Sequence, residues 1–218
     1  DNGNYFSVDL SYKKKIDNQK INTDIINKTI QEAKSIIEEN YKNFKILHLI
    51  VVKYILDKKN YFKLNEDIYV NDFTIEIKFL LSPINVINKI KDSFKKNHIS
   101  IDKILCSSYV KTLLYNKYFE KYDVKVFIDI GFLKTSILIY FKDRLKFIDY
   151  IPIGGENITK DISSVLEVDK IRAERIKKKF NQSNATFESE DNQNNLLIKI
   201  VHARVEEIID LSFKNYTD

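Results

Sequence analysis

Two short loops in the second half of this chain contain residue types that can hold phosphate groups. The first runs from Asp129 through Gly131 to Thr135, and the second contains the pair Gly154 and Gly155. The chain has 4 glycines among 218 residues, and three of them lie in these loops. Glycine is needed where a backbone takes positive φ or approaches another group closely. A glycine-rich turn also exposes backbone N–H groups that can hold phosphate oxygens, and this is the chemistry that the loops favour.

A hairpin of strands must position the first loop. An apolar strand ends at Asp129, a second strand is expected over 135–141, and a turn at 142–144 leads to a third strand over 145–151. We expect the first of these strands to be buried, with Asp129 at its end, facing the loop. The same position also suits an aspartate that only accepts hydrogen bonds from nearby backbone.

The first part of the chain shows the order strand, helix, strand, strand. Residues 4–16 alternate as a strand does, and Asn22 or Thr23 can cap a helix that continues to about Glu39. A long apolar strand is expected over 44–57, and one or two more strands over 67–81.

The secondary structure of the middle and the end of the chain is predicted from residues that favour helix starts and from the periodicity of apolar residues. Ser82 is a favoured N-cap and Pro83 suits the first helical position, so a helix is expected through Asn97. The remaining expectations are a short strand over 101–105, a helix over 107–118, a polar loop over 181–195 and an amphipathic helix from 196 to about 213.

Four segments, in order along the chain, carry a family resemblance. They are 46–50 with 54–57 (ILHLI, YILD), 151–155 with 158–162 (IPIGG, ITKDI), 173–177 (AERIK) and 200–209 (IVHARVEEII). Together they resemble FtsA, a family of bacterial actin-like cell-division proteins. The strand–carboxylate–glycine–threonine–strand hairpin is similar to the second phosphate loop of the actin, Hsp70 and sugar-kinase superfamily.

The resemblance implies an α/β fold: an actin-like ATPase, ribonuclease-H-like core with an inserted strand-helix-strand-strand (SHS2) subdomain. It implies four parts, namely 1–82 as the inserted SHS2-like subdomain (1C), 83–123 as part of the first core subdomain (1A), 124–165 as the second core subdomain (2A) with the phosphate loop, and 166–218 as an incomplete start of subdomain 2B. We also expect the sequence to be an internal piece of a longer protein, because it has no methionine and residue 1 is Asp.

The resemblance also implies a nucleotide site for ATP with Mg²⁺. Its residues would be Asp129, Gly131, Lys134, Thr135, Gly154, Gly155, Glu174, Lys177 and Lys178. In the superfamily the carboxylate at the position of Asp129 lies close to the nucleotide's metal ion. Glu174 and Lys177 share one helix face and would reach the ribose and adenine, with Lys178 nearby. The pair is equally compatible with a surface ion pair, which contributes less than about 1 kcal/mol.

The first loop departs from the family pattern, which usually reads DIGGGTTD. Phe132 and Leu133 replace two glycines, Lys134 replaces a threonine, and Ser136 stands where an aspartate is common. Bulky residues restrict φ, so we expect poor nucleotide binding and at most a weak ATPase. No catalytic residue and no protein metal-ligand set is predicted.

The resemblance implies a scaffold. It would link the FtsZ ring to the cytoplasmic face of the cell membrane at the division site, self-associate into polymers and recruit downstream divisome proteins. The family's C-terminal membrane helix is not in this sequence. One alternative is PilM, a pilus-assembly actin homologue, although the strand at 46–50 and the helix at 200–209 favour FtsA. Another is an Hsp70-like or kinase-like ATPase, which the altered loop and the lack of a candidate base disfavour.

Composition argues against other classes of function. The net charge of +5 comes from lysines interleaved with acidic residues, so no nucleic-acid partner is expected. Cys106 is alone, which leaves no disulfide framework or thiolate metal site. His48 and His202 are isolated from other ligand types, and no apolar run reaches the roughly 20 residues of a membrane span.

Overall fold

The computed structural model describes residues 5–64, 68–180 and 192–216. The chain divides into two compact units. The first unit comprises residues 1–126 and 138–146, and the second comprises 127–137 and 147–218. The fold is mixed α/β, with one four-stranded and one three-stranded sheet.

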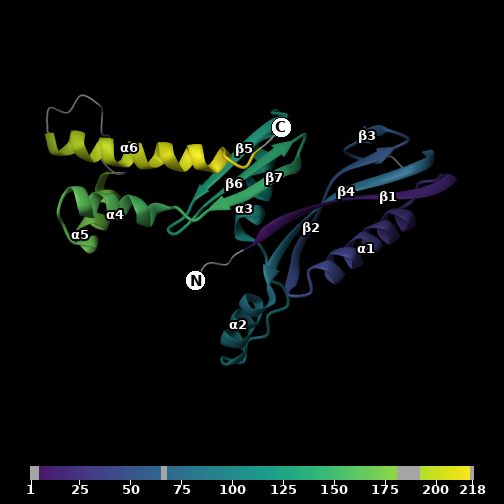
Figure 1. Cartoon of the computed structure of the whole chain (residues 1–218), viewed down its shortest axis with the longest axis horizontal. Helices are drawn as coiled ribbons and strands as arrows, with labels where there is room; N and C mark the ends of the chain where they lie inside the picture. Colours follow the sequence, from purple (N-terminus) through teal and green to yellow (C-terminus); the bar gives the residue numbers. More distant parts are fainter. Residues whose placement is uncertain (1–4, 65–67, 181–191, 217–218) are drawn as a thin grey trace. The chain divides into compact units, whose positions relative to one another are not determined.

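The four-stranded sheet is antiparallel and has the order β1-β4-β2-β3 (Figure 1). Its elements are β1 (Phe6–Lys20), α1 (Thr23–Asn40), β2 (Phe44–Leu56), β3 (Lys59–Tyr61) and β4 (Tyr69–Pro83). The strand, helix, strand, strand order expected from periodicity is confirmed, with the short β3 as an addition. β2 pairs with β4 and β3.

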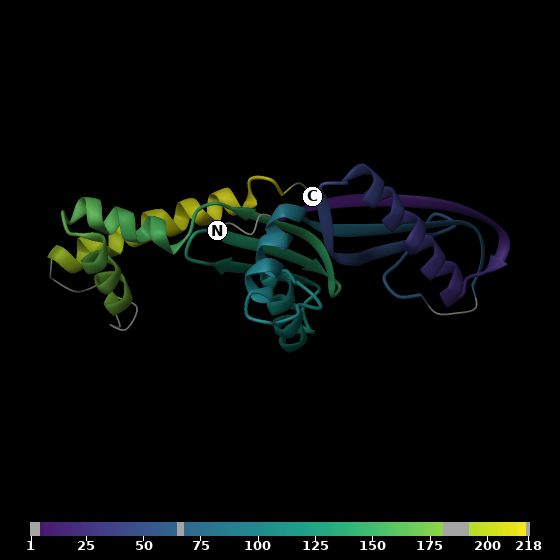
Figure 2. The same cartoon turned by 90° about the horizontal axis from the view of Figure 1, so that it is seen from below.

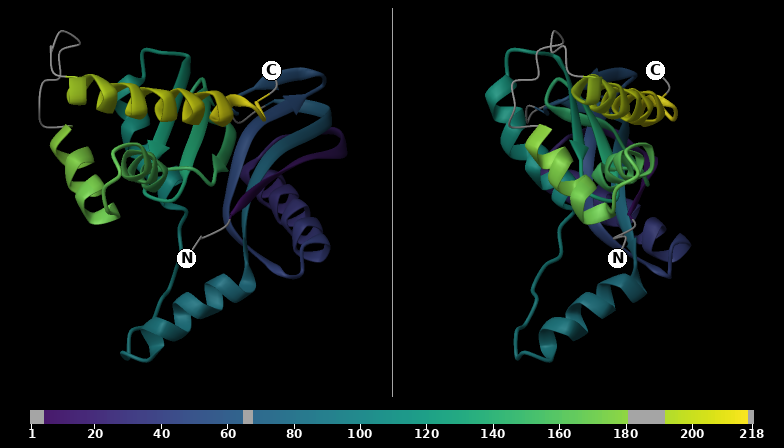
Figure 3. Two further views of the ribbon diagram at one scale, coloured as in Figure 1. Left: turned by 60° about the vertical axis from the view of Figure 1, so that its left-hand side comes forward. Right: turned by 90° about the vertical axis from the view of Figure 1, so that its left-hand side faces the viewer.

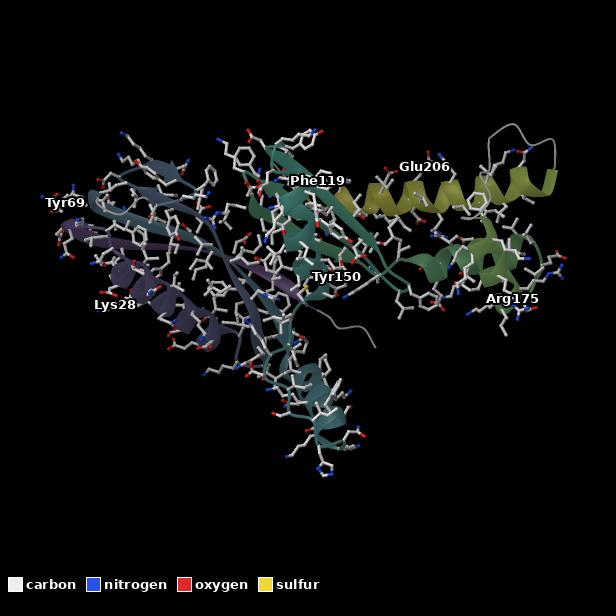
Figure 4. The ribbon with its side chains drawn as sticks, turned by 180° about the vertical axis from the view of Figure 1, so that it is seen from behind. Lys28, Tyr69, Phe119, Tyr150, Arg175 and Glu206 are labelled. Atoms are coloured by element: carbon white, nitrogen blue, oxygen red, sulfur yellow. The ribbon has the colours of Figure 1, made fainter. Side chains whose placement is uncertain are left out.

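Helix α1 covers one face of this sheet, as the views in Figures 1 and 2 agree. Asn22 caps the helix, because its Oδ1 accepts a hydrogen bond from the Ile25 amide at 2.9 Å. Such a cap stabilises by about 1 kcal/mol. Ala33 and Ile37 of α1 pack in one core with alternate residues of β4: Phe73, Ile75, Ile77 and Phe79. Lys28 lies on the outer side of the helix (Figure 4), so the 3.6-residue period separates core from solvent.

The opposite side of β4 carries a buried charge. The Lys78 side chain is 4% exposed, and its ammonium group lies 2.5 Å from Oδ1 of Asp9, whose side chain is 71% exposed. Asp9 stands directly opposite Lys78 in the pairing of β1 with β4. A buried ammonium group is costly without a partner, so Asp9 compensates Lys78 at the rim of the sheet.

Two expectations for the middle of the chain are wrong. Ser82 and Pro83 belong to β4, where they pair with Lys45 and Phe44, so Ser82 does not cap a helix. Helix α2 (Ile84–Lys95) begins after Pro83, which occupies the N-cap position. The strand expected over 101–105 is also absent, since these residues have no regular secondary structure.

His48 holds the end of that irregular segment. Its Nε2 accepts a hydrogen bond from the Cys106 amide at 2.9 Å, just before helix α3 (Ser107–Asn116). The imidazole also packs edge-on against Tyr109, with ring centroids 4.9 Å apart. Burial, followed by the positive charge of Lys103, lowers the pKa of His48. The neutral ring is therefore the form that the fold requires.

This contact predicts a pH dependence for the first unit. The unfolded chain takes up a proton at His48 below about pH 6.5, whereas the folded chain resists it, so stability should fall as the pH drops through that value. His48→Gln keeps an acceptor that does not titrate, and it should flatten the change in urea midpoint between about pH 7.5 and 5.5. His98→Asn, at an exposed position with φ 57°, is the control and should leave the slope unchanged. An unchanged slope in the His48 variant would contradict this role.

The three-stranded sheet has the order β5-β6-β7, formed by β5 (Val124–Ile130), β6 (Thr135–Phe141) and β7 (Arg144–Ile151). The hairpin predicted from the sequence is confirmed. The expected burial of the first strand is wrong, because β5 is an edge strand with alternate side chains exposed: Val124, Val126, Ile128 and Ile130. The buried strand is β6, whose residues 135–140 are at most 3% exposed.

Three helices follow the hairpin in the second unit: α4 (Gly155–Val165), α5 (Lys170–Phe180) and α6 (Asn192–Phe213) (Figure 3). They share a core of Ile158, Ile162, Ala173, Leu197 and Ile200. Helix α6 begins at Asn192 rather than at Leu196, and the rest of the predicted loop, 181–191, lies outside the described residues. Among the residues described, no helix has the length and apolar character needed to cross a bilayer.

Candidate functional site

The first glycine loop is a tight turn whose glycine is needed for space. The Gly131 amide donates to the carbonyl of Lys134 at 2.9 Å. A Cβ at Gly131 would lie 2.9 Å from that same carbonyl oxygen. No glycine among the described residues has positive φ. Close backbone approach, rather than a left-handed conformation, therefore explains glycine here.

Backbone hydrogen bonds fasten the two loops to each other. The Gly155 amide donates to the Gly131 carbonyl, and the Glu156 amide donates to the Phe132 carbonyl, both at 2.8 Å. The loops meet at Gly154, where a Cβ would lie 2.5 Å from the Gly131 oxygen and 2.7 Å from the Phe132 oxygen. Gly154 has φ −157°, which any residue adopts, so only the close approach demands glycine.

This arrangement uses the N–H groups at the start of α4. The first amides of a helix have no partner within the helix, so they can bind an anion. Here Gly155 and Glu156 donate to the facing loop, and Asn157 donates to the Gly154 carbonyl at 3.0 Å. The Gly154 amide in turn donates to Oδ1 of Asn157 at 3.1 Å. The start of α4 is satisfied within the protein and has little capacity left for phosphate.

The polar side chains of the first loop also have internal roles. Thr135 is fully buried, and its hydroxyl donates to the Ile153 carbonyl at 2.8 Å. The ammonium group of Lys134 lies 5.1 Å from the centre of the Tyr150 ring, and Figure 4 labels that ring. Asp129 is half-buried near the end of β5. Lys134 and Thr135 thus belong to the loop, and each side chain contacts another segment of the second unit.

A second polar cluster joins α4 to α5. Lys177 donates to the Gly155 carbonyl at 2.8 Å, to the Thr159 hydroxyl at 2.7 Å and to Oε2 of Glu174 at 2.7 Å. Thr159 lies 2.6 Å from the same carboxylate oxygen. The Phe132 ring lies 6.0 Å from the Lys177 ammonium group. The structure therefore brings the predicted Glu174, Lys177 and Gly155 together.

The charges of this cluster are strongly coupled. The hydrogen bond from Lys177, followed by that from Thr159, lowers the pKa of Glu174 to about 2. Glu174 is therefore an anion at neutral pH. Lys178 is more remote, because its ammonium group lies 3.5 Å from Oε1 of Glu174 and its side chain is 72% exposed. A carboxylate can accept hydrogen bonds from the hydroxyls of a sugar, and a neighbouring ammonium group can donate to them.

Comparison with known proteins places this second half of the chain. The model of the family "Cell division protein FtsA" matches residues 126–212, which include both glycine loops, helices α4 and α5, and all of α6 except its last residue. This part of the chain is FtsA-like. The FtsA of Bacillus subtilis (strain 168) is 37% identical over 99 residues, which are 38% of this chain and 22% of that protein. The FtsA of Helicobacter pylori (strain J99) is 24% identical over 146 residues, 66% of this chain and 29% of that protein.

The chain thus spans less than a third of the length of these curated relatives. A solved structure titled "PilM-PilN type IV pilus biogenesis complex" covers 94% of this chain and 52% of its own, with a TM-score of 0.62 and 10% identity. At that identity the likeness concerns the fold alone. The fold is the actin-like one that the sequence predicts.

Some residues that take part in these contacts were not predicted from the sequence. Thr159 is central to the α4–α5 cluster, and Asn157 caps α4, yet neither was a candidate. The available signal was the spacing of Thr159, which follows Gly155 by one helical turn. Within the described ranges, no group of three or more His, Cys, Asp and Glu side chains could hold a metal ion.

Proposed function

We propose that this chain is part of an actin-like cell-division scaffold that acts through binding rather than through ATP turnover. The observation that carries the proposal is the fastening of the two glycine loops in the FtsA-like region. The Gly155 and Glu156 amides, which would otherwise bind phosphate, donate to the carbonyls of Gly131 and Phe132. A site built for turnover needs such donors free for the transferred group.

The proposed role is the one that the FtsA resemblance implies. The protein links FtsZ to the cytoplasmic face of the membrane at the division site, self-associates and recruits later division proteins. Two findings support it: the family match over 126–212 and the ordered strand, helix, strand, strand unit before it. In this proposal the unit within 1–82 is the inserted SHS2 subdomain, 83–123 and 124–165 belong to the two core subdomains, and 166–218 begins the fourth.

ATP with Mg²⁺ fits only one side of the site. The phosphate side does not fit, because the start of α4 is internally bonded and Thr135 donates to Ile153. The nucleoside side keeps the residue types that the resemblance requires, since Glu174 and Lys177 lie together as an ion pair 2.7 Å apart. We therefore propose weak nucleotide binding through the nucleoside and negligible hydrolysis.

PilM-type pilus assembly is the second candidate, favoured by the structural likeness over 94% of the chain. The family match and the curated relatives favour division instead. An Hsp70-like or kinase-like ATPase is disfavoured by the internally bonded loops.

The test uses the complete gene product with purified FtsZ. We expect it to sediment with FtsZ polymers equally well with and without ATP, because binding does not depend on the phosphate loops. Its phosphate release should match that of Asp129→Ala, the control for a metal-linked ATPase site. Turnover that disappears in Asp129→Ala would contradict the scaffold proposal. Failure to sediment with FtsZ, together with binding to a pilus-assembly protein, would favour the PilM-like alternative.

A further inference from the structure

A cavity of about 570 Å³ lies within the first unit. Strands β1, β2 and β4 line it with the sheet face that carries Glu76, and strand alternation puts Lys78 on the same face. The β6–β7 hairpin contributes Phe141, Arg144 and Lys146, and every lining residue belongs to this unit. Small-molecule sites have volumes of roughly 300–1,000 Å³, so the cavity is large enough for an organic ligand.

Specific contacts hold the hairpin to the loop that follows β3. Nη2 of Arg144 donates to the Phe62 carbonyl at 2.7 Å. The Phe62 ring packs edge-on against the Phe141 ring, with centroids 5.7 Å apart. The ammonium group of Lys142 lies 5.6 Å from the centre of the Phe62 ring. These contacts build the cavity wall from both segments, and two aromatic rings form part of that wall.

The charges on the sheet side of the cavity are paired with one another. Lys53 and Glu76 stand opposite each other in the pairing of β2 with β4, and their charged atoms are 3.1 Å apart. Asp9 is paired with Lys78 at 2.5 Å. Because these four charges form two ion pairs, the sheet offers a ligand polar contacts but no net charge.

Arg144 differs from these residues, because it forms no ion pair with a carboxylate within the described part of the chain. Its guanidinium group has five N–H donors, and its hydrogen bond there is the one to Phe62. Burial raises the pKa of Tyr54 and of Tyr109, and the charge of Arg144 opposes this effect on both. Half-buried groups thus sense the Arg144 charge, which attracts an anion more strongly there than in water.

We propose that this cavity binds a small organic carboxylate with a flat apolar body. The planar guanidinium group of Arg144 matches a carboxylate in shape and charge, and Lys146 adds a positive charge to the lining. The rings of Phe62 and Phe141 offer contact to an apolar body. Glu76 disfavours a ligand with several negative charges. The proposal concerns the first unit alone and does not depend on the scaffold role.

The probes are 2-naphthoate and 2-naphthamide, which share one ring system and differ in the negative charge. Both should enter the apolar part of the cavity, but only the naphthoate can form an ion pair with Arg144. We expect calorimetry on the complete gene product to show naphthoate binding about tenfold tighter than naphthamide, the size expected from one charge-assisted hydrogen bond.

Arg144→Gln removes the positive charge and keeps a side-chain N–H that can donate to the Phe62 carbonyl. Naphthoate affinity should fall about tenfold, whereas naphthamide affinity should change less than about twofold. Unchanged naphthamide binding and an unchanged urea midpoint show that the variant keeps its cavity and its fold. Arg175→Gln is the matched control, because it makes the same charge change at an exposed position of α5. It should leave both affinities unchanged.

Ser11→Trp tests whether the probes bind in this cavity. Ser11 lines the cavity from an exposed position of β1, opposite Glu76 in the pairing with β4. Tryptophan is well accepted in strands, so the sheet should persist. The larger side chain should fill part of the cavity and weaken the binding of both probes at least about tenfold.

Four results would overturn the inference. Equal affinities of the two probes in the wild type would show that the negative charge is not recognised. An equal loss of both in Arg144→Gln would make Arg144 a residue that only shapes the cavity. Undiminished binding in Ser11→Trp would place the probes elsewhere. Absence of naphthoate binding would show that the cavity is closed or occupied in the complete gene product.

Discussion

Replacing Gly154 by alanine should destabilise the second unit by about 3 kcal/mol, the upper end of what overpacking costs. The new Cβ would meet three backbone atoms: Gly131 O at 2.5 Å, Phe132 O at 2.7 Å and Lys134 N at 2.8 Å. Backbone atoms cannot rotate out of the way as a side chain can, so the two loops must move apart. The first amides of α4 then lose their hydrogen-bond acceptors. Urea unfolding with hydrogen exchange of α4 measures the loss.

Gly155→Ala is the matched control one residue further on. Its Cβ would lie 3.5 Å from the Lys177 ammonium group and 3.6 Å from the Gly131 oxygen, which are ordinary contacts. Because Gly155 is the first helical residue and alanine is accepted there without a close contact, this variant should be as stable as the wild type or slightly more so. Equal stability of the two alanine variants would show that the loops are not held as tightly as we describe.

Arg204→Lys should loosen α6 from α4 and cost about 2 kcal/mol. The guanidinium group of Arg204 donates two hydrogen bonds to the Asp161 carboxylate, from Nε to Oδ2 at 2.6 Å and from Nη2 to Oδ1 at 2.9 Å. Both side chains are partly buried, which makes the pair stronger than a surface one. Lysine keeps the positive charge but cannot form the bidentate contact with a carboxylate. The measurement is the free energy of unfolding of the second unit.

The control is Glu207→Gln, which removes a second and more exposed partner of Arg204. It should cost less than about 1 kcal/mol. A double-mutant cycle of Arg204→Lys with Asp161→Asn should show coupling of about 1 kcal/mol or more. Strictly additive effects of the two changes would indicate that the contact contributes nothing specific. Glu206 lies on the side of α6 away from α4 (Figure 4) and does not take part in this contact.

The sequence was informative where one local rule decides the structure. The period of α1 and the cap at Asn22 depend on neighbouring residues, and both are confirmed. The prediction that β5 is buried was wrong, because a central strand and an edge strand can have the same run of apolar residues. Only the order of strands in the sheet distinguishes the two cases. Ser82 was misjudged for a similar reason, since its pairing with Lys45 in β2 takes precedence over its capping tendency.

In the candidate site, too, local spacing predicted some features, whereas others depend on packing between distant segments. Glu174 and Lys177 could be placed on one helix face by spacing alone. Their contact with Thr159 depends on how α4 packs on α5, which spacing does not determine. The glycines were singled out as positions of positive φ or of close approach, and the sequence alone does not tell which of the two applies. A close approach of 2.5 Å at Gly154 involves a loop more than twenty residues earlier in the chain.

The buried Lys78 has a consequence for how the first sheet reaches its correct alignment. Alternate residues of β1 and β4 are apolar, so a slide of two positions would keep every side chain on its proper face. Such a misaligned sheet would bury nearly as much apolar surface, but it would carry Asp9 away from the position opposite Lys78. The ammonium group would then be enclosed without a counter-charge. One buried lysine thus discriminates against a shifted pairing that hydrophobicity alone would tolerate.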